Sequence, residues 1–114
     1  MRFAGRFAAV TGGGSGLGEA TALALAREGA AVAVLDIDAT RASAVARAIK
    51  NGGGAATGVA IDVTDPSSVD AAFTAAEDWR GRGADILVNS AGILRIAPLL
   101  DFAFADWERL MAVN

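Results

Sequence analysis

The feature that most constrains the fold is a regular alternation of short apolar runs with longer, Ala-rich segments. The apolar runs have the length of strands and are continuous, which is typical of parallel strands that are covered on both faces. We expect strands at 7–10, 31–35, 57–61 and 86–88, and helices at 17–28, 39–50, 66–79 and, last, up to Asn114. This order predicts parallel βαβ units with right-handed crossovers, and therefore a doubly wound α/β sheet in three α/β/α layers.

Residues at the borders of these segments are typical of helix ends. Gly29 follows the first helical segment, and we expect it to be the C-cap of that helix. Asp38 precedes the second and is a candidate N-cap, while Pro66 suits the first turn of the third. These end signals support four separate helices within one domain spanning residues 1–114.

The composition excludes several classes of function. With 54% hydrophobic and 20% charged residues, the chain is too apolar to be a disordered segment. The net charge is −3, so no nucleic-acid partner is expected. The chain has no Cys and no His, which rules out disulfides, zinc–thiolate sites and a Ser-His-Asp triad, and we predict no metal site.

Nothing in the sequence indicates a membrane or an exported protein. The longest apolar run, Ala30–Leu35, is much shorter than a membrane span. The N-terminal residues lack an apolar stretch of signal-peptide length. We therefore expect a cytoplasmic protein with no membrane partner.

A glycine cluster, Thr11–Gly18, lies directly between the first strand and the first helix. Gly12, Gly16 and Gly18 suit a turn that must bend tightly, approach a pyrophosphate closely and pack a helix on a strand. The N-terminus of the helix would then face the phosphates with its free N–H groups. The spacing is G-x-x-x-G-x-G, and no Lys follows the last Gly, so this is not a P-loop. The alternative is a Gly-rich turn without a ligand, but its position favours a Rossmann-type dinucleotide site.

Asp36 ends the second predicted strand, 18 residues after Gly18. A carboxylate at this point can accept hydrogen bonds from both ribose hydroxyls of an adenosine. It would repel a 2′-phosphate by about 4 kcal/mol per unit charge at 4 Å in an effective dielectric of 20. Asp36 therefore favours NAD over NADP. The other possible role is a loop carboxylate or helix cap, for which Asp38 is better placed.

Four separated stretches resemble, in order and over essentially the whole chain, the N-terminal half of the short-chain dehydrogenase/reductase family. These stretches are the Thr11–Gly18 turn, Asp62-Val63, Asn89-Ser90-Ala91-Gly92 and Val113-Asn114. The resemblance implies an NAD-dependent oxidoreductase that transfers hydride between nicotinamide and a small alcohol or carbonyl substrate. It also implies a homo-oligomer when the enzyme is complete.

The resemblance assigns a role to individual positions. Asp62 would accept from the adenine amino group, Val63 would lie beside the ring, and Asn89 would steady the central strands. Asn114 would be the Asn of the catalytic tetrad and would hold a water of the proton relay. The implied cofactor-binding residues are Gly12, Gly14, Ser15, Gly16, Leu17, Gly18, Asp36, Ile37, Asp62, Val63, Asn89, Ala91 and Gly92.

Some positions depart from the family pattern. Ser90 replaces a usual Asn, and Ser15 stands where NADP-preferring members often have a basic residue, which again favours NAD. The segment Ala103–Ala105 is more apolar than usual, and we expect the aromatic residues near it to be core or interface. The largest departure is catalytic: the chain has no Tyr, and its only Lys is Lys50, so the family's Ser and Tyr-x-x-x-Lys are missing.

We therefore expect the 114-residue chain to be the cofactor-binding half of an enzyme, and to be inactive by itself. Two alternatives remain open at this point. One alternative is a non-catalytic dinucleotide-binding module, and the other is a subunit that a partner chain complements with the Tyr and Lys. An uncovered apolar strand at a sheet edge favours aggregation, and the fourth strand would leave such an edge in a stand-alone module, which argues against that alternative.

Overall fold

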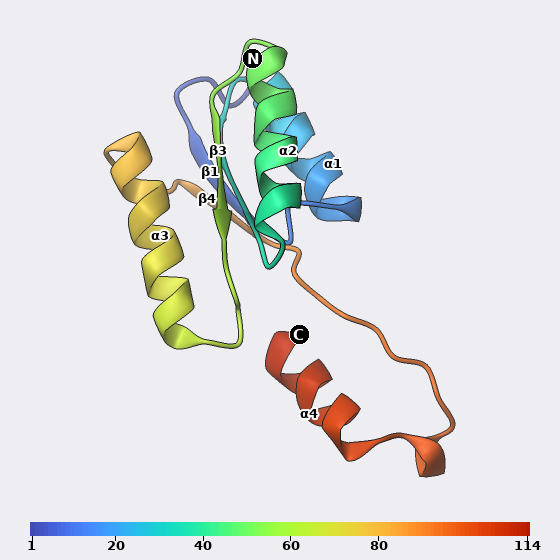
Figure 1. Cartoon of the computed structure of the whole chain (residues 1–114). Coiled ribbons are helices and arrows are strands. Elements are labelled where there is room, and N and C mark those ends of the chain that lie inside the picture. The colour runs from blue at the N-terminus through green and yellow to red at the C-terminus, as the bar shows by residue number, and fades with distance from the viewer.

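The computed structural model describes residues 1–114 and contains one sheet with helices on both faces (Figure 1). The elements alternate along the chain as the sequence pattern predicts. They are β1 (Phe7–Thr11), α1 (Gly16–Arg27), β2 (Ala31–Asp36), α2 (Ala39–Asn51), β3 (Ala56–Ala60), α3 (Pro66–Arg80), β4 (Ile86–Asn89), the 3₁₀ turn η1 (Leu99–Asp101) and α4 (Phe104–Val113). The predicted α/β fold class is confirmed.

The four strands are all parallel and lie in the order β3-β2-β1-β4. Ala9 in the centre of β1 pairs with Ala33 of β2 on one side and with Leu87 of β4 on the other. Along the chain, β2 and β3 are therefore added on one side of β1, and β4 is then added on the other side. This order is the doubly wound topology of a Rossmann-type sheet.

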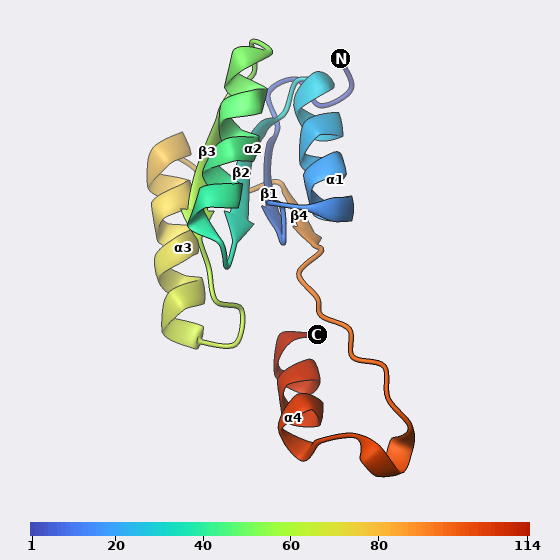
Figure 2. The same ribbon diagram turned by 45° about the vertical axis from the view of Figure 1, so that its right-hand side comes forward.

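Each face of the sheet buries its own core. Side chains of α1 and α2 pack on one face against Ala8, Val10, Val32 and Val34 of β1 and β2. Side chains of α3 pack on the other face against the alternate strand residues, including Phe7 and Leu35. Figure 2 shows α1 and α2 on one side of the sheet and α3 on the other. The continuous apolar strands are explained by this double coverage, because both faces of β1 and β2 are fully buried.

Two details of the predicted element ends differ from the structure, and a third is confirmed. The third strand runs one residue earlier than expected, at Ala56–Ala60, because its register places Ala56 beside Val32. The C-cap of α1 is Glu28, and Gly29 follows it with a left-handed backbone (φ 95°). Asp38 is the N-cap of α2 as expected, and its carboxylate accepts the N–H groups of Thr40 and Arg41.

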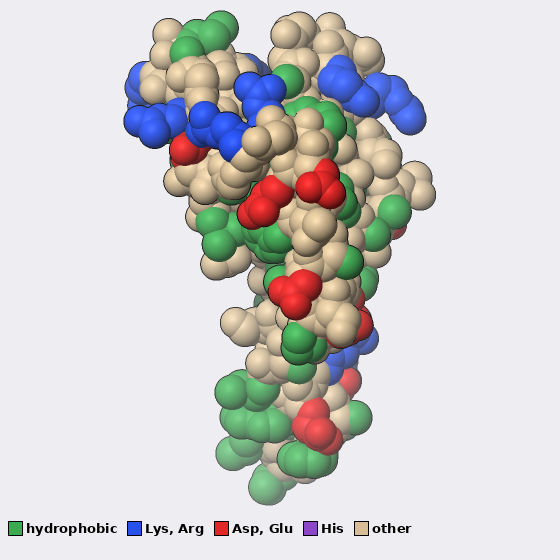
Figure 3. All heavy atoms as spheres, turned by 90° about the vertical axis from the view of Figure 1, so that its left-hand side faces the viewer, with side chains coloured by type: hydrophobic (Ala, Val, Ile, Leu, Met, Phe, Trp, Pro, Cys, Tyr) green, Lys and Arg blue, Asp and Glu red, His purple; other side chains and the backbone are tan.

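The last element, α4, lies apart from the sheet at the end of an extended segment (Figures 1 and 2). Apolar side chains gather over this end of the molecule in the space-filling view (Figure 3). Phe104 is 74% exposed and Trp107 is 53% exposed, so neither is core within this chain, whereas Trp79 packs edge-on against Phe7. The strand β4 pairs only with β1 and forms the predicted free edge of the sheet. No helix of the chain combines the length and the apolar character that crossing a membrane requires.

Candidate functional site

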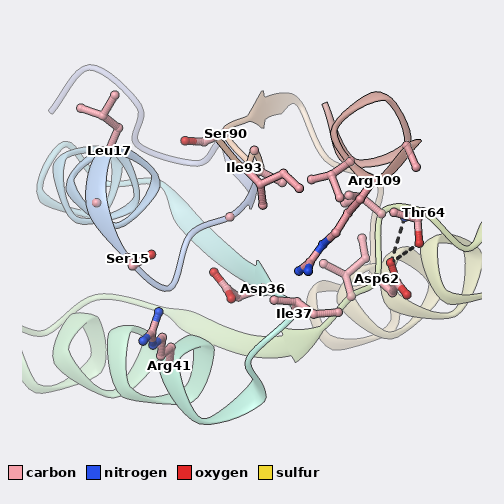
Figure 4. A pocket seen from close by; sticks show the side chains of 18 residues that line it. Ser15, Leu17, Asp36, Ile37, Arg41, Asp62, Thr64, Ser90, Ile93 and Arg109 are labelled. Carbon is pink, nitrogen blue, oxygen red and sulfur yellow. Dashed lines mark hydrogen bonds between the residues drawn. The ribbon is translucent and has the colours of Figure 1, made fainter. Parts of the chain in front are cut away.

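A cavity of about 700 Å³ opens at the carboxyl ends of the strands, where the chain order reverses about β1. Open α/β sheets bind their ligands at such a switch point, because the loops on its two sides diverge and leave a crevice. Figure 4 shows side chains from several loops and from α4 around this space. Its lining residues are Gly12, Ser15, Gly16, Leu17, Asp36, Ile37, Arg41, Ile61, Asp62, Val63, Thr64, Ser90, Ala91, Gly92, Ile93, Arg109, Ala112 and Val113.

The glycine turn between β1 and α1 forms one wall of the cavity. Gly12 and Gly16 have left-handed backbones, with φ of 66° and 56°, which residues with a Cβ rarely adopt. Ser15 is the N-cap of α1, but its side chain makes no capping hydrogen bond. Since the first N–H groups of a helix have no partner inside it, the start of α1 presents unpaired donors and a partial positive charge to the cavity.

Three glycines of the turn are also required by close packing. A Cβ on Gly12 would lie 2.7 Å from the backbone of Ala91, and one on Gly18 would lie 2.0 Å from the carbonyl oxygen of Gly12. A Cβ on Gly14 would lie 2.8 Å from Oδ2 of Asp36. The turn is therefore pressed against both neighbouring loops, and its backbone forms a cradle that side chains would fill.

Asp36 lies at the end of β2 and is only 7% exposed. Its Oδ2 accepts the N–H of Gly14 at 2.9 Å, and its Oδ1 accepts the N–H of Asp38 at 3.0 Å. A carboxylate has about four acceptor positions, so two remain for groups in the cavity. Asp36 thus both holds the glycine turn beside β2 and presents negative charge to the cavity.

Asp62 follows β3 and stands on the wall next to Asp36 in Figure 4. Its Oδ1 accepts the hydroxyl and the N–H of Thr64, at 2.6 and 3.0 Å. These two hydrogen bonds, that of the hydroxyl first, lower the pKa of the Asp62 carboxyl below its usual value. The N–H of Asp62 donates to the hydroxyl of Ser68 in α3. The carboxylate is therefore held in place and charged, while its Oδ2 has no hydrogen-bond partner in the chain.

The loop after β4 is held against the glycine turn by Thr11, a residue that our sequence analysis did not select as a site residue. Its hydroxyl oxygen accepts the N–H groups of Ser90 and Ala91, at 3.2 and 3.4 Å. The backbone carbonyl of Thr11 accepts the same Ser90 N–H at 3.1 Å. Thr11 is 4% exposed, so these bonds are shielded from water and fix Ala91 over Gly12.

Asn114 connects the end of α4 to the loop after β4. Its side-chain oxygen accepts the N–H of Ile93, and its side-chain NH₂ donates to the carbonyl of the same residue, both at 2.9 Å. A Cβ on Gly92 would lie 3.4 Å from the Asn114 oxygen. This paired hydrogen bond positions α4 so that Arg109, Ala112 and Val113 face the cavity.

Most of the predicted cofactor-binding residues lie around this one cavity. Four predicted site residues do not line it: Gly14 and Gly18 support the turn from behind, Asn89 ends β4 opposite Thr11, and Asn114 contacts Ile93. The cavity lining also includes Arg109, Ala112 and Val113 of α4, which were not among the predicted site residues. Their spacing places them on one face of the helix, and it is the signal in the sequence that could have identified them.

Comparison with known proteins shows long, continuous similarity. The chain is 44% identical over 114 residues to D-threitol dehydrogenase of Mycolicibacterium smegmatis, covering all of this chain and 44% of that protein. It is 41% identical over 114 residues to sorbitol dehydrogenase of Cereibacter sphaeroides, covering all of this chain and 43% of that protein. The chain therefore spans less than half the length of these relatives.

Solved structures show the same relation. The crystal structure of hydroxysteroid dehydrogenase from Escherichia coli matches with a TM-score of 0.92 and 36% identity, over 99% of this chain and 47% of that one. A dehydrogenase/reductase from Sinorhizobium meliloti 1021 matches with a TM-score of 0.90 and 45% identity, over 96% and 44%. The family model described as short chain dehydrogenase matches residues 6–114. With this match over nearly its whole length, the chain belongs to the short-chain dehydrogenase family of oxidoreductases.

Proposed function

We propose that this chain is the dinucleotide-binding half of an NAD-dependent short-chain dehydrogenase that acts on a small alcohol or carbonyl compound. The observation that carries this proposal is the cavity at the switch point of the sheet. One wall is the N-terminus of α1 with its glycine turn, and the next carries the carboxylates of Asp36 and Asp62. A dinucleotide needs this combination, with donors for its phosphates and acceptors for its ribose and adenine groups.

The residues present fit such a cofactor. The glycine turn would hold the pyrophosphate, because its glycines have no side chains to keep a ligand from the backbone and the first N–H groups of α1 are unpaired. Asp36 would accept the ribose hydroxyls through its two remaining acceptor positions, and Asp62 would accept the adenine amino group through its free Oδ2. Ala91 and Gly92 would line the cofactor near its ribose. The bound nicotinamide would supply the hydride acceptor or donor of the reaction.

The preference for NAD over NADP rests on Asp36. The carboxylate is only 7% exposed, so its charge is poorly screened by water. Ser15 adds no positive charge to the turn that would offset a 2′-phosphate. Arg41 lines the same cavity, but its Nε lies 3.5 Å from Oδ2 of Asp38 and is paired there.

We further propose that these 114 residues do not turn over substrate by themselves. The chain contains no Tyr, and its only Lys, Lys50 in the last turn of α2, does not line the cavity, so the proton-transfer pair of the family is missing. Asn114 would serve as the tetrad Asn. Its amide already pairs with Ile93, but the oxygen and the NH₂ group each keep one position for a water. The complete enzyme would work as a cytoplasmic homo-oligomer.

The test compares two proteins, residues 1–114 and the longest reading frame that contains them. Both are assayed for NAD reduction with a panel of secondary alcohols, followed by NADH absorbance, and for NAD binding by calorimetry. We expect turnover only by the longer protein. Turnover by residues 1–114 would refute the assignment of proton transfer to missing residues. Binding without turnover in both proteins would favour a non-catalytic binding module.

A further inference from the structure

The cavity contains one cation that the proposed cofactor contacts do not use. Arg109 projects from α4 into the space between Asp36 and Asp62, next to Ile37 (Figure 4). It comes from the side of the cavity opposite the glycine turn. Within the cavity lining, the only other cation is Arg41, on α2.

Arg109 makes no hydrogen bond or ion pair within the chain. The acidic residue one turn before it, Asp106, is already paired with Arg95 at 3.2 Å. Arg41, the other cation in the cavity, is paired with Asp38. The Arg109 guanidinium therefore keeps all its N–H donors available to a ligand in the cavity.

We propose that Arg109 stacks on the adenine base of the bound dinucleotide, an inference that rests on the function proposed above. The base is expected between the ribose acceptor Asp36 and the amino-group acceptor Asp62, and the guanidinium lies in that interval in Figure 4. A planar guanidinium packs flat on an aromatic ring and is attracted to its face. Ile37, which is 73% exposed, adds an apolar side chain beside the same space.

Stacking on the base explains the position of Arg109 better than a contact with phosphate. The pyrophosphate is assigned to the start of α1, on the opposite wall, and Asp36 disfavours a 2′-phosphate. Contact with the base also gives α4 a second attachment to the body of the protein. Within this chain α4 lies apart from the sheet and is joined to the β4 loop through Asn114 and Ile93.

The test uses the longest reading frame that contains residues 1–114, with the variants Arg109→Leu and Arg109→Lys. Arg47→Leu is the matched control, since Arg47 is exposed on α2, makes no ion pair and does not line the cavity. Calorimetry measures Kd for NAD, NADP, ADP-ribose and nicotinamide mononucleotide, which lacks adenine. Hydrogen exchange of α4 is followed with and without ADP-ribose, and thermal unfolding confirms that each variant folds.

We expect Arg109→Leu to raise the Kd of NAD and ADP-ribose by about 3- to 30-fold, the range typical of a cation on an aromatic face. Arg109→Lys should recover only part of this loss, because an ammonium has no plane to stack. Nicotinamide mononucleotide should bind equally well to all variants. ADP-ribose should slow exchange in α4 of the parent protein and of Arg47→Leu, but not of Arg109→Leu.

Three results would overturn the assignment to the base. They are an unchanged Kd in Arg109→Leu, full recovery in Arg109→Lys, or a loss confined to NADP, which would place the guanidinium on a phosphate. If the parent protein binds NAD and Arg109→Leu binds it equally well, only this inference fails. If the parent protein binds neither NAD nor ADP-ribose, the proposed function and this inference fail together.

Discussion

Replacing Asp36 by Asn removes one negative charge from the cavity and changes the shape of the side chain very little. At about 4 Å and an effective dielectric of 20, one unit of charge on a 2′-phosphate is repelled by the carboxylate by about 4 kcal/mol. Removing that repulsion improves NADP binding by up to roughly a thousandfold. NAD loses affinity instead, since a hydrogen bond to a neutral acceptor is weaker than one to a charged acceptor by about 1 kcal/mol. The preference for NAD should therefore fall by up to roughly three to four orders of magnitude.

The same substitution has a structural cost that can be worked out from the hydrogen bonds. Both carboxylate oxygens of Asp36 accept backbone N–H groups, from Gly14 and from Asp38. An Asn offers one oxygen and one NH₂ group, so one of these two N–H donors loses its acceptor. A buried donor without an acceptor costs about 1–3 kcal/mol in the free energy of unfolding. We expect a destabilised but folded variant.

The assay is calorimetric measurement of Kd for NAD and NADP on the longest reading frame, with urea unfolding measured in parallel. Asp65→Asn is the matched control. It removes the carboxylate that caps α3, which makes no ion pair and does not line the cavity, and Asn caps a helix about as well as Asp. An unchanged ratio of the two Kd values in Asp36→Asn would refute the ribose role of Asp36. An equal change in Asp65→Asn would show that the ratio responds to the net charge of the protein and not to the Asp36 carboxylate.

Three further variants test the framework of the sheet and of the cavity. Asp85 accepts the first N–H of β1 at 2.8 Å, and this bond, together with nearby arginines, lowers its pKa. The stabilisation by the Asp85 carboxylate is therefore complete above the pKa of the unfolded state, and it is lost as the pH falls through the lower pKa of the folded state. In urea unfolding, the free energy of unfolding of Asp85→Asn should therefore decrease less at acid pH than that of the parent protein. Gly18→Ala should abolish NAD binding in calorimetry, because its Cβ would lie 2.0 Å from a backbone oxygen of the glycine turn, whereas Gly83→Ala, with its nearest contact at 3.9 Å, should bind normally. Asn114→Ala should speed hydrogen exchange at the Ile93 amide by at least about tenfold if the paired bond holds α4, and unchanged exchange would contradict that role.

Much of this protein could be predicted from sequence because its signals are local. Strand length, helical pattern and end residues such as Asp38 depend on interactions between residues a few positions apart. The left-handed glycines of the turn are also a local requirement of the backbone. The sequence by itself therefore determined the alternation of strands and helices, the doubly wound class, and the glycine turn that forms one wall of the cavity.

Only the tertiary structure decided which distant residues share the cavity. Thr11 contacts Ser90 across 79 positions of sequence, and Asp36 contacts Gly14 across 22, and neither bond leaves a local pattern. Arg109 looks like an ordinary exposed residue of α4 until Asn114 ties that helix to the β4 loop. Such contacts depend on strand order and on where each loop ends in space. They follow from packing the whole sheet, which no short stretch of sequence contains.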